Sequence, residues 1–260
     1  MSWNTRRNIL QGIAALVLSF LVPAIGWTQT AFEKQLPAVF RLWNAEKATE
    51  LALVLQRLGN GGVIEDVRLF LLAECLKRAG HDAEASDLYG RLMKQYPDSI
   101  GARRAGLPYI LMMTKNGVSP ESLVLLKQLA LALPTAYQRG RALEGLAQAL
   151  PPGHREKGEL ALLSLRAYRE PSGSLAPAKD AVNLLKSLIE NHGQWSLTPE
   201  EWVEICLAAT AEGLGQSVLK LGAFLKPTLG PHGAGYQLLI QADALRMLGQ
   251  RDRALSLLES

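Results

Sequence analysis

The sequence predicts an all-α fold in which helical hairpins stack into a superhelical array, an α-solenoid. Ala and Leu dominate many segments, while runs of β-branched residues are scarce, and this balance favours helices over strands. Apolar residues recur with a helical period from about residue 45 onward, and one hairpin pattern occurs twice. Because 48% of the residues are hydrophobic and 20% charged, the chain can bury a sizeable core.

The N-terminal segment 1–26 has the order of a secretory signal peptide. A head with Arg6 and Arg7 precedes an apolar stretch from about residue 9 to 22, which Pro23 and small residues end. We expect cleavage after Gly26 or a few residues later, which leaves 27–260 as one helical repeat domain. The alternative is an uncleaved membrane anchor, although the apolar stretch is short for a span of about 20 residues.

These features predict a periplasmic or otherwise exported protein that keeps no stable membrane span once the signal is removed. The residues "TRRNILQ", 5–11, resemble the bacterial twin-arginine export motif, with Ile9 and Gln11 departing from its commonest form. Arginine pairs also occur in ordinary secretory signals, so both export routes stay open. No cysteine precedes Cys75, which disfavours a lipid-anchored lipoprotein.

The first hairpin is predicted between residues 69 and 97. The inner face of its first helix consists of Leu69, Leu72, Ala73 and Leu76, at the i, i+3, i+4, i+7 spacing. Gly80 can adopt the left-handed conformation that ends a helix. A second helix begins near Asp82, with Ala85, Leu88, Tyr89 and Leu92 on its inner face, and Pro97 ends it.

Small residues indicate how the two helices meet. Ala73 and Ala85 fall where antiparallel helices would cross closely, and Tyr89 would fill the space beyond the crossing. The same pattern returns, at one constant offset for all six positions, in Leu238, Ala242, Leu245, Gly249, Ala254 and Leu258. This offset is close to five units of about 34 residues. We therefore expect further, degenerate hairpins between the two copies.

The remaining segments also read as helices. Their expected spans are 45–58, 102–115, 120–133, 137–150, 155–169, 177–191, 199–213 and 215–225, for ten or eleven helices in all and no strand. Ser119 and Thr198 are N-cap residues followed by proline, and Thr198 with Glu201 forms a capping box. Residues 151–154 and 171–177 are expected to be connectors. The chain ends partway through an expected helix, so either a longer chain or a partner would cover its last face.

The first hairpin resembles the tetratricopeptide repeat, a helix–turn–helix unit of about 34 residues. The matching positions are Leu69, Leu72, Ala73, Leu76, Ala85, Tyr89, Leu92 and Pro97. This resemblance implies that the first helix of each pair lines a groove that binds a protein or peptide. The groove residues that it implies are Val67, Phe70, Glu74, Lys77, Arg78, Tyr236, Leu239, Asp243, Arg246 and Met247. Their mixed charges and apolar groups suit an extended peptide or a helix.

Charge and cysteine content constrain the other partners. Removing Arg6 and Arg7 from the 28 basic residues leaves 26 against 24 acidic residues, without a basic stripe, so nucleic acid is excluded as a partner. Cys75 and Cys206 are expected to be small buried hydrophobes, with a disulfide as the alternative in an exported protein.

No catalytic or metal-binding pattern is found, so the sequence predicts neither an enzyme nor a cofactor. The four histidines form no local metal spacing, and no nucleophile elbow occurs. Trp43, Trp195 and Trp202 could stack on a sugar, but packing is favoured. The helix pairs also resemble the superhelical scaffold of soluble lytic transglycosylases, without the catalytic motif of that family. We therefore expect a non-enzymatic scaffold for protein–protein contacts in the bacterial cell envelope. The alternative is the non-catalytic part of such a peptidoglycan-processing system, with peptidoglycan as partner.

Overall fold

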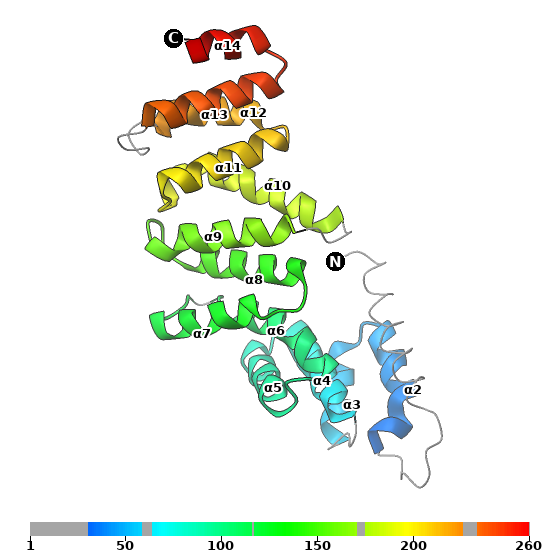
Figure 1. The fold of residues 1–260 in the computed structure, drawn as a ribbon. Coiled ribbons are helices and arrows are strands. Elements are labelled where there is room, and N and C mark those ends of the chain that lie inside the picture. Colours follow the sequence, from blue (N-terminus) through cyan, green and yellow to red (C-terminus); the bar gives the residue numbers. More distant parts are fainter. Residues whose placement is uncertain (1–30, 59–63, 116, 171–174, 226–232, 260) are drawn as a thin grey trace.

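A computed structural model describes residues 31–58, 64–115, 117–170, 175–225 and 233–259, and this part of the chain is all-helical (Figure 1). It holds thirteen α-helices and one short 3-10 helix, η2 (His192–Gln194). The α-helices are α2 (Ala31–Asn44), α3 (Ala48–Arg57), α4 (Glu65–Arg78), α5 (Asp82–Gln95), α6 (Ile100–Met113), α7 (Pro120–Leu131), α8 (Ala136–Ala149), α9 (Arg155–Tyr168), α10 (Leu175–Glu190), α11 (Pro199–Ala211), α12 (Gly215–Leu225), α13 (Gly233–Met247) and α14 (Arg251–Glu259). The predicted fold class is confirmed.

The helices form an elongated stack with α2 and α14 at its two ends (Figure 1). Each helix packs against the next one along the chain. Many also pack against the next but one: α4 contacts α6, α6 contacts α8, and α11 contacts α13. A chain that packs in this way buries apolar surface mainly between near neighbours, which is the organisation of helical repeat proteins.

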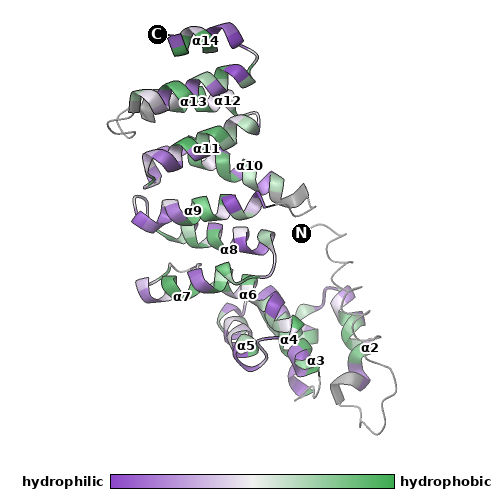
Figure 2. Cartoon of the chain, in the orientation of Figure 1, coloured by the Kyte–Doolittle hydropathy of each residue, from purple (hydrophilic) through white to green (hydrophobic). Residues whose placement is uncertain are grey.

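Two hydrophobic clusters run through the stack. The first lies between α2 and α6 and contains Leu55, Leu69 and Tyr89, while the second lies between α6 and α13 and contains Leu143 and Trp202. Helix α6 joins them, because its Ile110 belongs to the second cluster and its Met112 to the first. Hydrophobic and hydrophilic residues alternate along the helices that carry these clusters (Figure 2).

Three of the hairpins share one turn geometry. Gly80, Gly213 and Gly249 have φ values of 84°, 80° and 76°, which only glycine adopts without strain. In each turn the next residue donates its N–H to a carbonyl five residues earlier in the chain, at 2.9 Å, as in His81 to Leu76. This is the Schellman arrangement. It confirms the helix ends predicted at Gly80 and Gly249, and the same stop lies at Gly213, where the expected span 199–213 ends.

The alanines that define the predicted crossings are buried. Ala73 and Ala85 are 0% exposed, and Ala242 and Ala254 are each 7% exposed. The two copies differ at their outer position, where Tyr89 is fully buried but Leu258 is 57% exposed. The reason is that α5 is packed between α4 and α6, whereas α14 packs chiefly on α13 within the described residues.

The number of helices and one connector differ from the sequence-based expectation. Helix α2 was not expected, and it contains Pro37 in its interior. Helix α10 begins at Leu175, inside the predicted connector 171–177. The expected count of ten or eleven helices is therefore wrong: the eight expected spans and the two hairpins already make twelve helices, and α2 is the thirteenth α-helix of the described residues. The predicted caps are present: Ser119 accepts the N–H of Ser122, and Thr198 and Glu201 form the expected capping box.

The constant offset between the first and last hairpins does not correspond to an unbroken series of hairpins. Within the described residues, seven helices separate α5 from α13, whereas four complete hairpins would need eight. The contacts show where the pairing changes: α8 packs on α10 and α10 on α12, but α11 also packs on α13, and this last contact is the most extensive of the three. The alternation of first and second helices therefore shifts at α10 and α11.

Candidate partner-binding surface

Tyr89 of α5 links two of the residues predicted on α4, Phe70 and Glu74. Phe70 is half-buried, and its ring centroid lies 6.3 Å from that of Tyr89 on α5. The Tyr89 hydroxyl donates a hydrogen bond to the carboxylate of Glu74, which also pairs with Lys77 at 3.2 Å. Val67 packs against the first hydrophobic cluster. The α4 set is thus a preformed group of an aromatic pair and an ion pair.

Burial and the neighbouring carboxylate fix the protonation state of this tyrosine. Burial is the larger cause and raises the pKa of Tyr89, and the charge of Glu74 raises it further. Tyr89 is therefore a neutral donor at any physiological pH. Its hydrogen bond holds the Glu74 side chain, which is only 16% exposed.

Arg78 lies at the end of α4 and faces back toward the N-terminal helices. Its guanidinium carbon lies 4.2 Å from the centroid of the Trp43 ring, which is a cation–π contact. Trp43 is half-buried against the first cluster, and Trp202 is 2% exposed in the second. Trp43 and Trp202, both considered for a stacking platform, thus belong to different parts of the stack.

The residues predicted on α13 are more exposed. Leu239 and Met247 are each 47% exposed, and Arg246 pairs with Asp243 at 2.6 Å. Tyr236 donates a hydrogen bond to Glu200 of α11 at 3.4 Å. Helix α13 lies near one end of the stack and α4 near the other (Figure 1), so the structure does not bring the two predicted sets together in one site.

A second preformed group lies on α8 and α9 and was missed by the sequence analysis. The rings of Tyr137 and Tyr168 have centroids 6.4 Å apart, and Tyr168 donates to Glu144 at 2.7 Å. Glu144 also pairs with Arg141 at 3.1 Å. Burial raises the pKa of Tyr168 and the hydrogen bond to Glu144 raises it further. The arrangement repeats that of Phe70, Tyr89, Glu74 and Lys77 on the first hairpin.

One signal in the sequence could have found this second group. At one constant offset, close to two repeat units, Phe70, Glu74 and Lys77 are followed by Tyr137, Arg141 and Glu144, with the order of the two charges reversed. The correspondence was hidden because the tyrosine of the second helix does not keep that offset. Tyr168 is the last residue of α9, whereas Tyr89 lies in the middle of α5.

Helix α6 connects the two groups into one surface. One repeat unit after the first hairpin, Ala102, Ala105 and Gly106 stand at the small or apolar inner positions, and Arg103 stands at the position of Phe70. Arg103 is exposed. Because α6 packs on both α4 and α8, we call α4, α6 and α8 the first-helix row.

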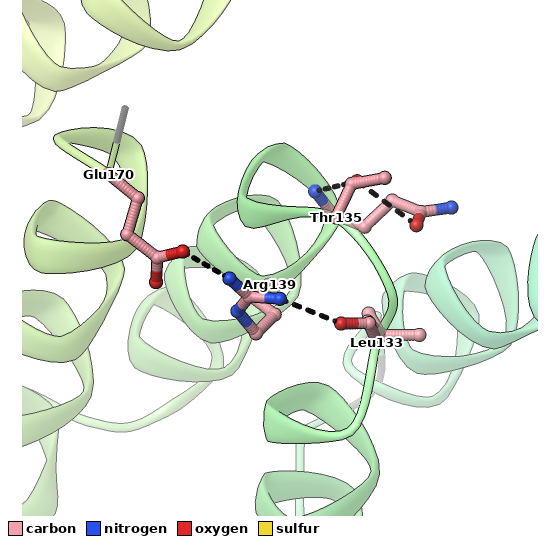
Figure 3. Close-up of polar contacts among 5 residues, drawn as sticks. Leu133, Thr135, Arg139 and Glu170 are labelled. Atoms are coloured by element: carbon pink, nitrogen blue, oxygen red, sulfur yellow. Dashed lines mark hydrogen bonds and ion pairs between the residues drawn. The ribbon is translucent and has the colours of Figure 1, made fainter. Parts of the chain in front are cut away.

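Contacts of Arg139 link the start of α8 to the end of α9 at the end of this row (Figure 3). Arg139 donates to the main-chain oxygen of Leu133 at 3.0 Å and pairs with Glu170 just beyond α9. Thr135 caps α8 by accepting the N–H of Gln138 at 3.1 Å. These contacts hold the connection between α7 and α8 against the end of α9 and so position Tyr137 and Arg141.

The described residues contain no group of three or more His, Cys, Asp or Glu side chains able to hold a metal ion. Cys75 and Cys206 are buried, free thiols in separate clusters, and burial raises the pKa of each to about 12. Among the described helices, none is long and apolar enough to cross a membrane.

Comparison with known families assigns part of the stack. Residues 69–99 match the sequence model of the tetratricopeptide repeat, and this match covers most of α4 and all of α5. A search of curated proteins finds no match. The hairpin formed by α4 and α5 is therefore a tetratricopeptide repeat, set in an all-helical stack of successive helix pairs.

Proposed function

We propose that this chain is a non-enzymatic scaffold that binds a protein partner along the first-helix row. The supporting observation is the tetratricopeptide repeat at residues 69–99, a kind of repeat that typically mediates protein–protein contacts. The row presents aromatic groups beside ion pairs on two hairpins of the same design, at Glu74 and at Glu144. Such a surface suits an extended or helical segment that carries both charges and apolar side chains.

A charge reversal on the row tests this proposal. Arg103 is exposed on α6 between the two aromatic groups, so Arg103→Glu should weaken partner capture without affecting the fold. Arg91→Glu is the matched control, because Arg91 is an equally exposed arginine on α5, a second helix of the stack. The measurement is recovery of one reproducible protein band from cell extract by the immobilised chain. The proposal predicts that R103E loses the band and R91E keeps it; equal recovery would contradict it.

We further propose that the scaffold works in the bacterial envelope after export. This part of the proposal is supported by residues 1–26, with their arginine head, apolar stretch and small residues, all of which lie outside the described residues. Fusion of residues 1–40 to a phosphatase that is active only outside the cytoplasm tests it. Export predicts phosphatase activity that falls when the apolar stretch is interrupted by a charge at Leu16. Activity that is absent in the unaltered fusion contradicts export.

A further inference from the structure

A hollow of about 200 Å³ lies beside the α8–α9 hairpin, between α8, α9, α10 and the segment that follows η2. The polar groups that line it include Glu144, Gln148, Lys157, Gln194 and Trp195. Gln148 and Gln194 are exposed, so the hollow opens to solvent at their side. For comparison, a cavity of about 150 Å³ holds benzene, so this space admits a small organic group rather than one water molecule.

Trp195 supplies a donor that the described residues do not satisfy. Its indole Nε1 atom is buried and has no hydrogen-bond partner there. An indole N–H can only donate, so a ligand that satisfies it must offer an acceptor. The Trp195 ring itself is held in place, since it packs against the second hydrophobic cluster.

Lys157 adds a buried positive charge to the same hollow. The residue is 6% exposed, and its ammonium group donates to the main-chain oxygen of Leu150 at 2.9 Å. The same nitrogen lies 5.3 Å from the centroid of the Trp195 ring. None of the ion pairs among the described residues includes Lys157. The bond to Leu150 uses one of three N–H donors, and it caps α8 without neutralising the charge.

The carboxylate in the hollow is already engaged elsewhere. Glu144 accepts hydrogen bonds from Tyr168 at 2.7 Å, from Gln148 at 3.2 Å and from Arg141 at 3.1 Å. Its charge is therefore balanced by Arg141 rather than by Lys157. What remains is a cation that forms no ion pair among the described residues and, on the ring below it, an N–H donor without a partner. Burial lowers the pKa of Lys157 because it disfavours the charged form.

We propose that this hollow binds a carboxylate group, which accepts hydrogen bonds from the ammonium of Lys157 and the indole N–H of Trp195. An oxyanion supplies the missing negative charge and the missing acceptors together, which a neutral ligand does not. The hollow has room for the carboxylate and a few carbon atoms. This chemistry is offered by small free acids, by acidic side chains and by chain termini, and the proposal holds independently of the scaffold role.

Nuclear magnetic resonance of the indole N–H groups tests the proposal with the whole 260-residue chain. Three probes, each adjusted to neutral pH, distinguish the possible sources of the carboxylate. N-acetylalanine carries a terminal carboxylate, N-acetylglutamate amide carries a side-chain carboxylate, and N-acetylalaninamide carries none. The Trp195 signal is assigned by its loss in Trp195→Phe. We expect it to shift downfield and to saturate at millimolar concentrations of one or both acids, at constant ionic strength, while the neutral amide leaves it unmoved.

A test variant and a matched control show whether the shift of the Trp195 signal arises from binding in this hollow. Lys157→Met should weaken binding by about tenfold or more, since a hydrogen bond to a charged group is lost. Lys186→Met is the matched control, because Lys186 is an exposed lysine on the neighbouring α10 and should leave affinity unchanged. The Trp202 signal reports whether the core is intact. If Lys157→Met alters that signal, Trp195→Phe is used as the test variant in its place, and calorimetry should show that it binds the acids several-fold more weakly than the wild type does.

Three results would overturn the proposal. They are an equal shift with the neutral amide, no shift with either acid, or equal weakening by Lys157→Met and Lys186→Met. Because the probes are small and no partner protein is present, none of these results bears on capture by the first-helix row.

Discussion

Gly140 on α8 lies directly against the ring of Tyr168 on α9. A Cβ atom at residue 140 would lie 2.5 Å from two ring carbons, and the hydroxyl of Ser164 donates to the Gly140 main-chain oxygen at 2.8 Å. The absence of a side chain at this crossing lets Tyr168 reach Glu144. In the first hairpin the predicted crossing residues Ala73 and Ala85 are both 0% exposed, so small buried residues recur between paired helices although their identities differ.

This contact predicts that Gly140→Ala destabilises the fold. The Tyr168 ring is 2% exposed and cannot move aside, so overpacking should lower the free energy of unfolding by about 1–3 kcal/mol in urea denaturation. Gly90→Ala is the control, since its nearest contact would be an ordinary 3.6 Å from the Tyr109 ring. That substitution should raise stability by up to about 1 kcal/mol, because alanine favours a helix interior. Equal effects of both variants would show that the crossing is not tight.

Replacing Arg68 should lower the free energy of unfolding by more than replacing Gly140 does. Arg68 donates two hydrogen bonds to Glu65, at 2.7 and 2.6 Å, and one at 2.8 Å to the main-chain oxygen of Leu55 near the end of α3. The side chains of Arg68 and Glu65 are each 10% exposed. Arg68→Met leaves a buried carboxylate without this cation and should cost about 3–5 kcal/mol, measured by chemical denaturation. Arg246→Met, in an exposed pair, should cost less than about 1 kcal/mol. A cost for Arg68→Met no greater than this control would refute the assignment.

The ion pair between α9 and α11 predicts a pH-dependent contribution to stability. Arg166 donates to both carboxylate oxygens of Glu204, at 3.0 and 2.7 Å, and these bonds lower the pKa of Glu204. A lowered folded-state pKa stabilises the fold above the ordinary glutamate value, and this stabilisation is lost as the pH falls through the folded-state pKa. Since the pair is largely exposed, its contribution should stay below about 1 kcal/mol.

Unfolding of the wild type and Glu204→Gln measures this contribution. The difference in stability between the two proteins should be present near neutral pH. It should vanish in acid, where Glu204 is protonated and is as uncharged as the glutamine that replaces it. A difference that stays constant between the two conditions would mean that the carboxylate charge has no part in it.

The two cysteines should be unreactive in the folded chain. Burial raises the pKa of Cys75 and Cys206 to about 12, so very little thiolate exists near neutral pH. Ellman's reagent should therefore label neither thiol quickly under native conditions and both after denaturation. Rapid native labelling would mean that the helices open locally, and failure to label in denaturant would mean that the thiols are joined in a disulfide.

Local signals were sufficient for the helices other than α2 and for several of their ends. The turns at Gly80 and Gly249, the capping box at Thr198 and the buried alanines each depend on residues close together in the chain, because helix period, caps and left-handed stops are local properties. The turn at Gly213 had the same signal, with Trp202 and Cys206 at the positions of Leu69 and Ala73, but at an offset that breaks the regular spacing.

The sequence by itself therefore determined the all-α class, the first and last hairpins and the small residues at their crossings. Only the tertiary structure decided which helices pair beyond them, where the alternation shifts at α10 and α11, and that the α4 and α13 residues lie apart. It also placed Lys157 beside Trp195. Small residues permit close packing with several neighbours, so the choice depends on the shapes of complete helix surfaces, which no short stretch of sequence specifies.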